Sequence, residues 1–473
     1  MVEVPRKTIS PIKVYTLLPK TNCKKCGVEN CMAFAVELVN MEAKLEKCSP
    51  LLEDERYKKN YSELKTMLSP PVSEVEFGKK DRRAKLGGEL VMHRHELTYL
   101  NPTIIALDVT DEMSESDLMK RIKFVEDFIY IYIGKELKLD ALAVRSVSNE
   151  PKKFGKIVKF VSDNTDLPLI LCSLNSEVMK AGLSAIGESS PLLYAATKDN
   201  WKEMAELSLK HKCPLTVSSP NDLGTLRSLT KTLLDYGVEN LVIDPGTFAG
   251  EGLSSTINAL TMLRWKACNE EDKLSGFPLM GTPITAWASS DGEGQSKAWR
   301  EALVAAMLIE RYADILIMHS LEGWTLLPNI ILRFNIYTDP RKPVSVKPGL
   351  RPIGNPNETS PVFVTSNFAL TYYLVSGDIE AGKIDCYLLV ADSEGISLES
   401  AVAGRKLTAK EVATIVKESG VEKMVKHRTL IIPGMAARLS GEIEDETGWK
   451  VMVGPRDSSG ILKFIQEKWK EPK

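Results

Sequence analysis

Four cysteines near the start of the chain have the spacing of a metal site. Cys23, Cys26 and Cys31 lie within nine residues, and Cys48 follows after sixteen intervening residues. Gly27 lets the backbone between them turn tightly. Three thiolates on one loop and a fourth that returns after a helix suit a cubane, and soft thiolates favour iron-sulfur clusters or zinc. We therefore expect these four residues to bind a [4Fe-4S] cluster.

Two other interpretations of these cysteines stay open. One is a structural zinc site with four cysteine ligands, although zinc sites usually pair two short Cys-x-x-Cys turns and Cys48 has no second cysteine beside it. The other is four unrelated buried thiols. The remaining cysteines lie far apart in apolar segments and are expected in the core: Cys172, Cys213, Cys268 and Cys386.

The segments that position these thiols are predicted to form a small domain and a flexible connection. We expect residues 1–62 to form a helical cluster domain, with an amphipathic run from Ala33 to Leu45 between the last two cysteines. Residues 63–99 are predicted to be an extended, poorly packed linker, because they contain Ser69-Pro70-Pro71-Val72 and a charged stretch from Lys79 to Lys85. Such a linker would let the first domain move.

The middle of the chain, residues 100–330, alternates short apolar runs with longer helical stretches. Runs of this kind suit strands that are buried on both faces. Eight strand-helix units in this length predict a (β/α)8 TIM barrel. The eight runs are Thr103–Val109, Ala141–Val147, Leu167–Leu171, Pro191–Ala196, Pro214–Ser218, Asn240–Asp244, Phe277–Gly281 and Asp314–Met318.

The last third of the chain contains an arm and a further α/β domain. Residues 331–361 are rich in proline and are predicted to be a second linker or a wrapping arm. Residues 362–473 are predicted to form a Rossmann-like, doubly wound domain, in which ligands bind at the carboxyl ends of the strands. Its expected strands are Val362–Val364, Tyr387–Ala391, Thr429–Ile432 and Lys450–Val453.

Composition excludes several classes of function. Lys and Arg number 61 against 63 Asp and Glu, and no basic block is interleaved with aromatic residues, so we expect no nucleic-acid partner. No apolar stretch reaches the length of a membrane span, and the first residues lack the apolar part of a secretory signal. We therefore expect a cytoplasmic protein with reduced thiols and no membrane contact.

The loops of the last domain have two interpretations when their residues are taken alone. Gly395, Gly434, Gly454 and Gly460 follow predicted strands, where glycine permits close approach of a large ligand but is also common in ordinary turns. Thr365 and Asn367 follow the first strand of that domain and more often cap a helix than contact a ligand. Neither signal is specific by itself.

The cysteine segment resembles a known family. Leu17 to Cys31, then Ala33-Phe34-Ala35 and Cys48-Ser49-Pro50, resemble the cluster domain of the corrinoid iron-sulfur protein large subunit, also called the gamma subunit of the acetyl-CoA decarbonylase/synthase complex. The resemblance extends in order over nearly the whole chain, through residues 191–197, 335–340, 364–373 and 447–456.

This resemblance implies a corrinoid methyl carrier of the reductive acetyl-CoA (Wood-Ljungdahl) pathway. Co(I) would accept a methyl group from methyl-tetrahydropterin and deliver it to the nickel-iron A-cluster of acetyl-CoA synthase, and the [4Fe-4S] cluster would reactivate Co(II). The chain would be a methyltransferase-type component that is largely a carrier. The residues implied to contact the cobamide are Thr365, Asn367, Thr371, Gly395, Ile396, Ser397, Leu398, Gly434, Gly460 and Ile461.

The resemblance also implies partners and a cobalt without a protein ligand. None of the five histidines lies in Asp-x-His-x-x-Gly, the motif that supplies a lower cobalt ligand in some cobamide proteins, so we expect a base-off cobamide. The implied partners are a small corrinoid iron-sulfur subunit in a heterodimer, a methyltransferase, and acetyl-CoA synthase with CO dehydrogenase.

Two alternative functions use the same residues differently. A barrel methyltransferase would bind the pterin itself, with Asp108, Arg145, Asp244 and His319 near the predicted strand ends, although these residues are also typical of turns and structural contacts. An electron-transfer protein would carry the cluster without a cobamide. We assign no catalytic residue.

Overall fold

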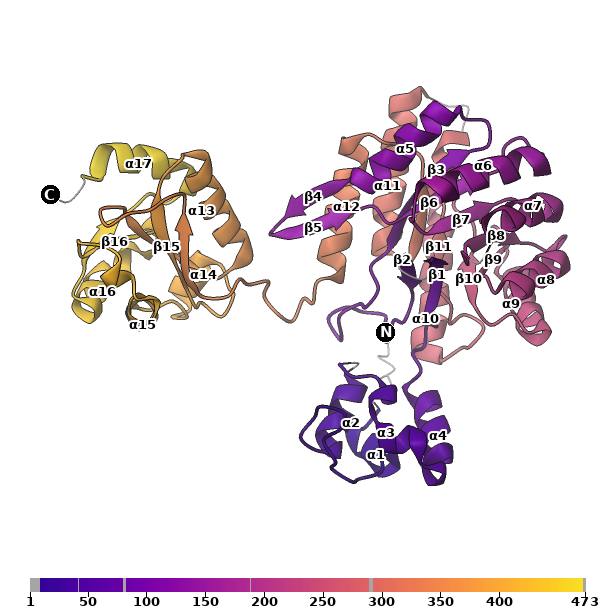
Figure 1. Cartoon of the computed structure of the whole chain (residues 1–473), viewed down its shortest axis with the longest axis horizontal. Coiled ribbons are helices and arrows are strands. Elements are labelled where there is room, and N and C mark those ends of the chain that lie inside the picture. Colours follow the sequence, from indigo (N-terminus) through magenta and orange to yellow (C-terminus); the bar gives the residue numbers. More distant parts are fainter. Residues whose placement is uncertain (1–8, 41, 80–81, 188, 289–291, 471–473) are drawn as a thin grey trace. The chain divides into compact units, whose positions relative to one another are not determined.

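The computed structural model describes residues 9–40, 42–79, 82–187, 189–288 and 292–470. The chain divides into two compact units, Met1–Tyr130 with Leu137–Tyr337, and Ile131–Glu136 with Thr338–Lys473. Figure 1 shows their helices and strands. Among the described residues, no helix is both long and apolar enough to cross a membrane.

Short helices around one apolar core build the cysteine module, residues 9–68. Asn30 caps the second helix, because its Oδ1 accepts a hydrogen bond from Ala33 N at 2.8 Å. Val14, Phe34 and Leu64 are fully or almost fully buried in the core. The elements are α1 (Pro11–Leu17), α2 (Cys31–Val39), η1 (Leu45–Lys47), α3 (Ser49–Glu53), η2 (Glu55–Tyr57) and α4 (Lys58–Leu68).

Residues 63–99 differ from the extended linker that the sequence predicted. After α4, strands β1 (Val75–Lys79) and β2 (Arg82–Leu86) form an antiparallel hairpin. Phe77 and Leu86 are buried in the same cluster as the strands of the barrel, and Gly78 N donates to Ser190 O at 2.8 Å, just before strand β8. Lys79, Arg82, Arg83 and Lys85 of the charged stretch therefore belong to the strands of a hairpin that packs at the amino end of the barrel.

Eight parallel strands form a nearly closed barrel, so the TIM-like fold predicted from the sequence is confirmed. Their order is β10-β9-β8-β7-β6-β3-β12-β11, and Ile243 N donates to Pro278 O at 2.8 Å where the two ends of the sheet meet. Each predicted run overlaps one strand: β3 (Ile104–Thr110), β6 (Ala141–Arg145), β7 (Leu169–Cys172), β8 (Leu192–Ala196), β9 (Leu215–Ser218), β10 (Leu241–Asp244), β11 (Met280–Gly281) and β12 (Ile315–Met318).

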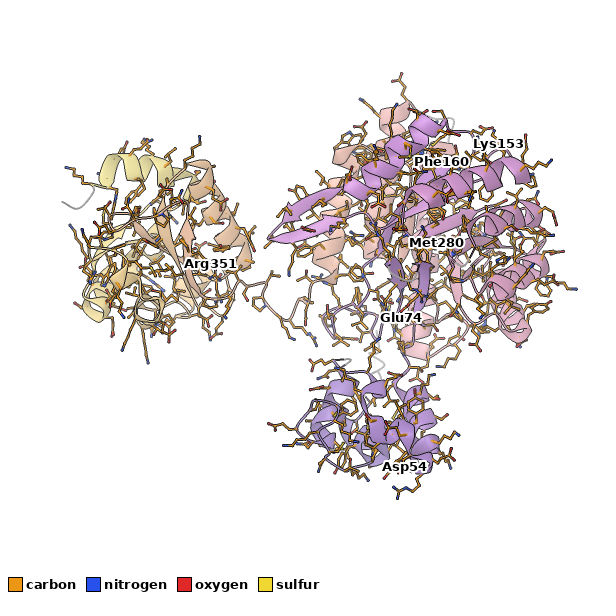
Figure 2. All side chains as sticks on the ribbon, in the orientation of Figure 1. Asp54, Glu74, Lys153, Phe160, Met280 and Arg351 are labelled. Atoms are coloured by element: carbon orange, nitrogen blue, oxygen red, sulfur yellow. The ribbon has the colours of Figure 1, made fainter. Side chains whose placement is uncertain are left out.

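Helices surround the barrel strands, which are buried on both faces as expected for this fold. Figure 2 shows Met280 among the strands and Lys153 on the outer helix α6. The sequence did not predict the hairpin formed by β4 (Ile129–Tyr132) and β5 (Lys135–Lys138). The helices are α5 (Glu115–Asp127), α6 (Pro151–Asn164), α7 (Ser176–Ile186), α8 (Trp201–His211), α9 (Leu223–Tyr236), α10 (Leu253–Glu270), η3 (Pro283–Ala288), α11 (Gly294–Glu310) and α12 (Gly323–Tyr337).

The C-terminal unit contains a five-stranded sheet in the order β13-β15-β14-β16-β17. Only β13 runs antiparallel to its neighbour among these strands. The strands are β13 (Gly349–Ile353), β14 (Val362–Ser366), β15 (Cys386–Ala391), β16 (Thr429–Ile432) and β17 (Lys450–Val453). The segment 331–361 is therefore not wholly an arm, since it includes the end of α12 and the edge strand β13, where Pro352 is tolerated.

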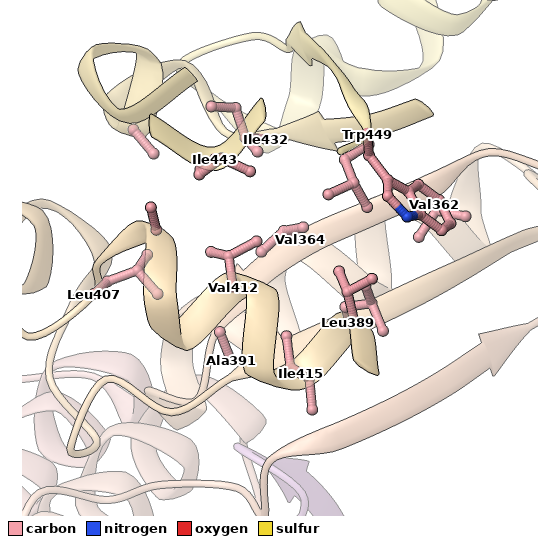
Figure 3. Packing of buried hydrophobic residues seen from close by; sticks show 14 of the residues in the cluster. Val362, Val364, Leu389, Ala391, Leu407, Val412, Ile415, Ile432, Ile443 and Trp449 are labelled. Carbon is pink, nitrogen blue, oxygen red and sulfur yellow. The ribbon is translucent and has the colours of Figure 1, made fainter. Parts of the chain in front are cut away.

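Helices cover both faces of this sheet. Val364 and Leu389 pack against Val412 of α15 on one face (Figure 3), and Phe363 and Ile379 belong to a second core on the other. The assignment as a Rossmann-like cobamide domain stays a prediction. The helices are α13 (Ala369–Ala381), α14 (Leu398–Ala403), α15 (Ala409–Ser419), η4 (Val421–Lys423), η5 (Gly434–Leu439), α16 (Ser440–Thr447), η6 (Ser458–Gly460) and α17 (Ile461–Lys468).

Candidate functional site

The four N-terminal cysteines line one small cavity. Cys23 is exposed and Cys26 half-buried, whereas Cys31 and Cys48 are buried. Thr21, Asn22, Lys24, Val28, Asn30, Phe34 and Pro50 complete the lining. Among the described residues, no group of three or more His, Cys, Asp or Glu side chains is arranged so that it could hold a single metal ion. The cavity nevertheless offers four thiols from one loop, one helix start and one returning turn, which is the donor set of a cubane.

The loop that carries Cys23 and Cys26 is hydrogen-bonded to the first turn of α2. Asn22 Oδ1 accepts a hydrogen bond from Cys31 N at 2.9 Å, so the loop is fastened to the first turn of the helix. Gly27 has a φ of +86°, in the region that favours glycine. The fold thus directs the side chains of Cys23, Cys26 and Cys31 into one cavity.

The thiols differ in their electrostatic surroundings. The backbone N–H of Lys25 and the hydroxyl of Thr21 hold the pKa of the Cys23 thiol below its usual value. Burial raises the pKa of the Cys48 thiol, and the nearby sulfur atoms of Cys31, Cys26 and Cys23 add to the increase. That mutual influence agrees with four sulfur atoms around one cavity.

A larger cavity, of about 290 Å³, lies at the carboxyl ends of the central strands in the C-terminal unit. In open α/β sheets this is the edge where ligands bind. Strands β14 and β16, the helix starts after them, and the turn after β17 surround it. Its lining is Phe363, Val364, Thr365, Thr371, Leu374, Val375, Ser397, Leu398, Glu399, Ile431, Ile432, Pro433, Met435, Gly454, Pro455, Arg456, Asp457, Ser458 and Ile461.

One polar atom in this cavity is buried without a partner. Thr365 is 1% exposed, and its Oγ1 has no hydrogen-bond partner in the structure. A buried hydroxyl without a partner is destabilising, so such a group in a cavity indicates a ligand that supplies the missing bond. Most of the surrounding side chains are apolar, as in sites that hold large organic cofactors.

Comparisons with known proteins cover nearly the whole chain. A family model described as "CO dehydrogenase/acetyl-CoA synthase delta subunit" matches residues 74–465, and one described as "Putative Fe-S cluster" matches residues 18–50. The chain is 44% identical to the acetyl-CoA decarbonylase/synthase complex subunit gamma 2 of Methanosarcina thermophila over 98% of this chain and 99% of the relative. The subunit gamma of Archaeoglobus fulgidus is also 44% identical, with the same coverage.

The chain belongs to the gamma-subunit family of acetyl-CoA decarbonylase/synthase complexes. Among solved structures, dihydropteroate synthase from Thermus thermophilus is 13% identical and is matched over 55% of this chain and 100% of that chain, with a TM-score of 0.40. The match of the Fe-S family to residues 18–50 includes all four cysteines of the thiol cavity and supports an iron-sulfur cofactor in this gamma-family chain.

The structure brings together half of the residues that the sequence assigned to the cobamide. Those that line the larger cavity are Thr365, Thr371, Ser397, Leu398 and Ile461. Those that do not line it are Asn367, Gly395, Ile396, Gly434 and Gly460. The second group lies in the loops that support the first, and its direct contact with a cofactor stays a prediction.

Close backbone packing explains the glycines in the second group. A Cβ at Gly434 would lie 2.9 Å from Arg456 N and from Gly454 O, and one at Gly395 would lie 2.9 Å from Ser345 Cβ. A Cβ at Gly460 would lie 3.0 Å from Pro455 Cβ. These glycines let neighbouring loops approach one another, which is the ordinary role of a glycine in a turn.

Sequence reasoning missed several lining residues of the gamma-family chain. Met435 follows Gly434 and is 37% exposed at the cavity. Leu374 of α13 is 57% exposed there, and Arg456 and Glu399 add charge at the rim. Their sequence neighbourhood carries no periodic signal, since Leu374 lies in a helix that is apolar on several sides and Met435 in a short 3-10 helix.

The polar residues at the barrel strand ends are engaged with one another. Asp108 is fully buried and accepts hydrogen bonds from Arg145 Nη2 at 2.7 Å and Arg121 Nη1 at 3.2 Å, and its Oδ1 lies 2.6 Å from His319 Nδ1. Burial alone would raise the pKa of Asp108, but the bond to His319 and the charges of its partners hold it below the usual value. Asp244 accepts from the Tyr194 hydroxyl at 2.8 Å.

Proposed function

We propose that this chain carries a methyl group on a bound corrinoid within an acetyl-CoA decarbonylase/synthase complex. The supporting observation is the presence in one gamma-family chain of a four-thiol cavity and a separate cavity at the carboxyl ends of the C-terminal sheet. A cluster site alone suits an electron carrier, and a ligand cavity alone suits a binding protein. A reductively maintained carrier needs both.

The thiolates of Cys23, Cys26, Cys31 and Cys48 would hold a [4Fe-4S] cluster, and the C-terminal cavity would hold the corrinoid. When bound, the corrinoid supplies a Co(I) nucleophile that accepts a methyl group from methyl-tetrahydropterin, and the cluster supplies the electron that restores Co(I) after oxidation. The two cofactors thus have separate sites in the chain.

The chain's own residues would bind and shield the cofactor rather than perform the chemistry. The hydroxyl of Thr365 would donate to a polar group of the corrinoid and so gain the partner that it lacks. Leu398 and Ile461 would contact its apolar edges and exclude water. No described histidine lines the cavity, which suits the base-off state that we propose.

Partners follow from the proposed role. The relatives are named as subunits of a complex, and a carrier must meet both a donor and an acceptor of the methyl group. We propose a small corrinoid iron-sulfur subunit as heterodimer partner, a methyltransferase as donor, and acetyl-CoA synthase with CO dehydrogenase as acceptor.

The test is a metal assay and visible spectrum of the anaerobically purified chain, with and without its small subunit. About four iron atoms and one cobalt atom per chain are expected from one cubane and one corrin. Cys48→Ala should lose the iron and keep the cobalt. The control is Cys213→Ala, which removes a buried thiol from the barrel and should change neither metal.

Each outcome has a distinct meaning. Iron without cobalt, or a cobalt signal that follows the barrel rather than the C-terminal unit after limited proteolysis, contradicts the carrier. Zinc in place of iron contradicts the cluster. Iron retained in Cys48→Ala would remove that residue from the ligand set.

A further inference from the structure

Asn367 lies at the end of strand β14 without lining the larger cavity. It is 5% exposed, and its side chain reaches across to the loop between β15 and α14, residues 392–397. That loop leads directly into Ser397 and Leu398, which do line the cavity. Asn367 therefore contacts the loop that lines the cavity and does not line the cavity itself.

Every polar atom of the Asn367 side chain is engaged with this loop. Its Oδ1 accepts hydrogen bonds from Ser393 N at 2.9 Å, from Ser393 Oγ at 2.8 Å and from Gly395 N at 3.0 Å. Its Nδ2 donates to Asp392 Oδ1 at 3.1 Å. The two N–H donors and the neighbouring carboxylate fix which way the amide points.

The loop also makes bonds of its own: Ser393 Oγ donates to Ile396 O at 3.0 Å, and Glu394 N donates to Asp392 Oδ1 at 2.9 Å. Glu394 and Gly395 both have positive φ, +56° and +73°, and the backbone bond from Ile396 N to Ser393 O is 3.2 Å long. A non-glycine residue such as Glu394 in the left-handed region is costly unless its surroundings maintain it. The amide of Asn367 adds such a constraint from a different strand.

We propose that Asn367 is a positioning residue that fixes the loop 392–397 so that Ser397 and Leu398 line the ligand cavity. This inference rests on the proposed function and replaces the direct cofactor contact predicted for Asn367 from the sequence. It also explains why the residue must be an amide. Its oxygen accepts from the N–H groups of Ser393 and Gly395, while its nitrogen donates to the carboxylate of Asp392.

The requirement for a donor next to Asp392 gives a charge-swap test. In Asn367→Asp, a carboxylate would face the carboxylate of Asp392 in a buried network, and the loop should move away from β14. In the double variant Asn367→Asp with Asp392→Asn, the acceptor and donor exchange places. The amide oxygen introduced at position 392 can still accept the hydrogen bond that Glu394 N now makes with Asp392, at 2.9 Å.

The experiment is a titration of the full-length chain, freed of corrinoid, with hydroxocobalamin, followed by its visible spectrum. Asn367→Asp should weaken binding by about tenfold, equivalent to about 1.4 kcal/mol. The double variant should bind within about threefold of wild type, which corresponds to less than about 0.7 kcal/mol. Asp392→Asn alone is the matched control, because it keeps an acceptor for the amide, and it should bind as wild type does.

The outcomes separate positioning from direct contact. If Asn367 donated to the ligand, the double variant would stay as weak as Asn367→Asp, because residue 367 would still lack an amide; that result overturns the inference. Unchanged binding in Asn367→Asp overturns it as well. The double variant is informative even if Asn367→Asp does not fold, and a wild-type chain that binds no hydroxocobalamin contradicts the proposed function instead.

Discussion

Two sets of parallel strands end in polar side chains in this protein, and they use them in opposite ways. At the carboxyl ends of the barrel strands, Asp108 is surrounded by Arg121, Arg145 and His319, and the charges are paired with one another. At the carboxyl ends of the C-terminal sheet, Thr365 lines a cavity and its buried hydroxyl has no partner.

The difference indicates which edge is available to a ligand. A buried charge network contributes to stability only while every member keeps its partner, so a ligand that took one member would leave the others unpaired. An unpartnered buried hydroxyl behaves in the opposite way, because a ligand that accepts its hydrogen bond removes the cost of burying it without a partner. The charge pairing at the barrel ends therefore favours a scaffold over the alternative of a pterin-binding barrel.

The largest expected effect is on the stability of the barrel. Asp108→Ala leaves two guanidinium groups and His319 without their shared carboxylate, and should lower the free energy of unfolding by about 3 kcal/mol. Urea unfolding measures the loss. Hydroxocobalamin binding should stay unchanged, and weaker binding would contradict the division of roles.

The control for this prediction is an exposed ion pair on the same barrel. Lys231 Nζ lies 2.6 Å from Asp235 Oδ2 on α9, and both side chains are more than 60% exposed. Asp235→Asn should change the free energy of unfolding by less than about 0.5 kcal/mol, because water screens such pairs. An equal loss in both variants would mean that burial does not govern the effect.

The next effect concerns a glycine that supports the cavity. In Gly434→Ala, the new methyl group would overlap backbone atoms of the turn after β17, which cannot move aside as a side chain can. We expect a loss of about 2 kcal/mol in stability and weaker hydroxocobalamin binding. Gly441 in α16 has open space around it, and Gly441→Ala should stabilise the chain by up to about 1 kcal/mol.

Thr365→Val tests whether the unpartnered hydroxyl in the C-terminal unit serves a ligand. Valine has nearly the shape of threonine and removes the unpartnered hydroxyl, so stability without ligand should stay the same or rise. Hydroxocobalamin binding should weaken by about tenfold. Thr429 lies at the amino end of β16, away from the cavity, and Thr429→Val should leave binding intact.

The last prediction concerns the pH dependence of stability within the barrel unit. Burial raises the pKa of Glu89 to about 8, with the charge of Asp314 adding to the effect and Arg264 opposing it. Between an unfolded value of about 4.5 and this folded value, unfolding releases a proton, so stability falls as pH rises.

Glu89→Gln removes that proton release. Relative to wild type, its free energy of unfolding should improve as the pH rises from 5 to 8, because only the wild-type protein loses this contribution over that range. Urea unfolding at the two pH values measures the change. Parallel pH profiles for the two proteins would show that Glu89 is ionised in the folded barrel.

Local signals predicted the strands and the thiol site well. Each apolar run of the barrel is buried on both faces, so composition alone indicated it, and the four cysteines are close enough in sequence for spacing to be informative. The cavity was only half predicted. Asn367 and Gly395 lie beside it because particular loops pack together. Such contacts between distant loops leave no periodic pattern in the sequence.

The misjudged linker has a similar cause. Prolines at 70 and 71 and a charged run suggested a flexible segment, but alternate residues of that run, Ala84 and Leu86, are buried. The alternation of buried and charged residues covers only a few positions, and the many charges around it made the segment look like a linker. Only pairing with β1 shows that one face of the strand is apolar.

That hairpin also sets how far the cysteine module can travel. Helix α4 ends at Leu68, while Val72 is fully buried and Ser73 N donates to Gly276 O at 2.9 Å, so residues 69–71 connect the module to the hairpin. Three residues span about 10 Å when extended. The connection between the module and the barrel can therefore be no longer than that. A group held within its short radius would meet the cluster at an effective concentration in the millimolar range, with no affinity between the two.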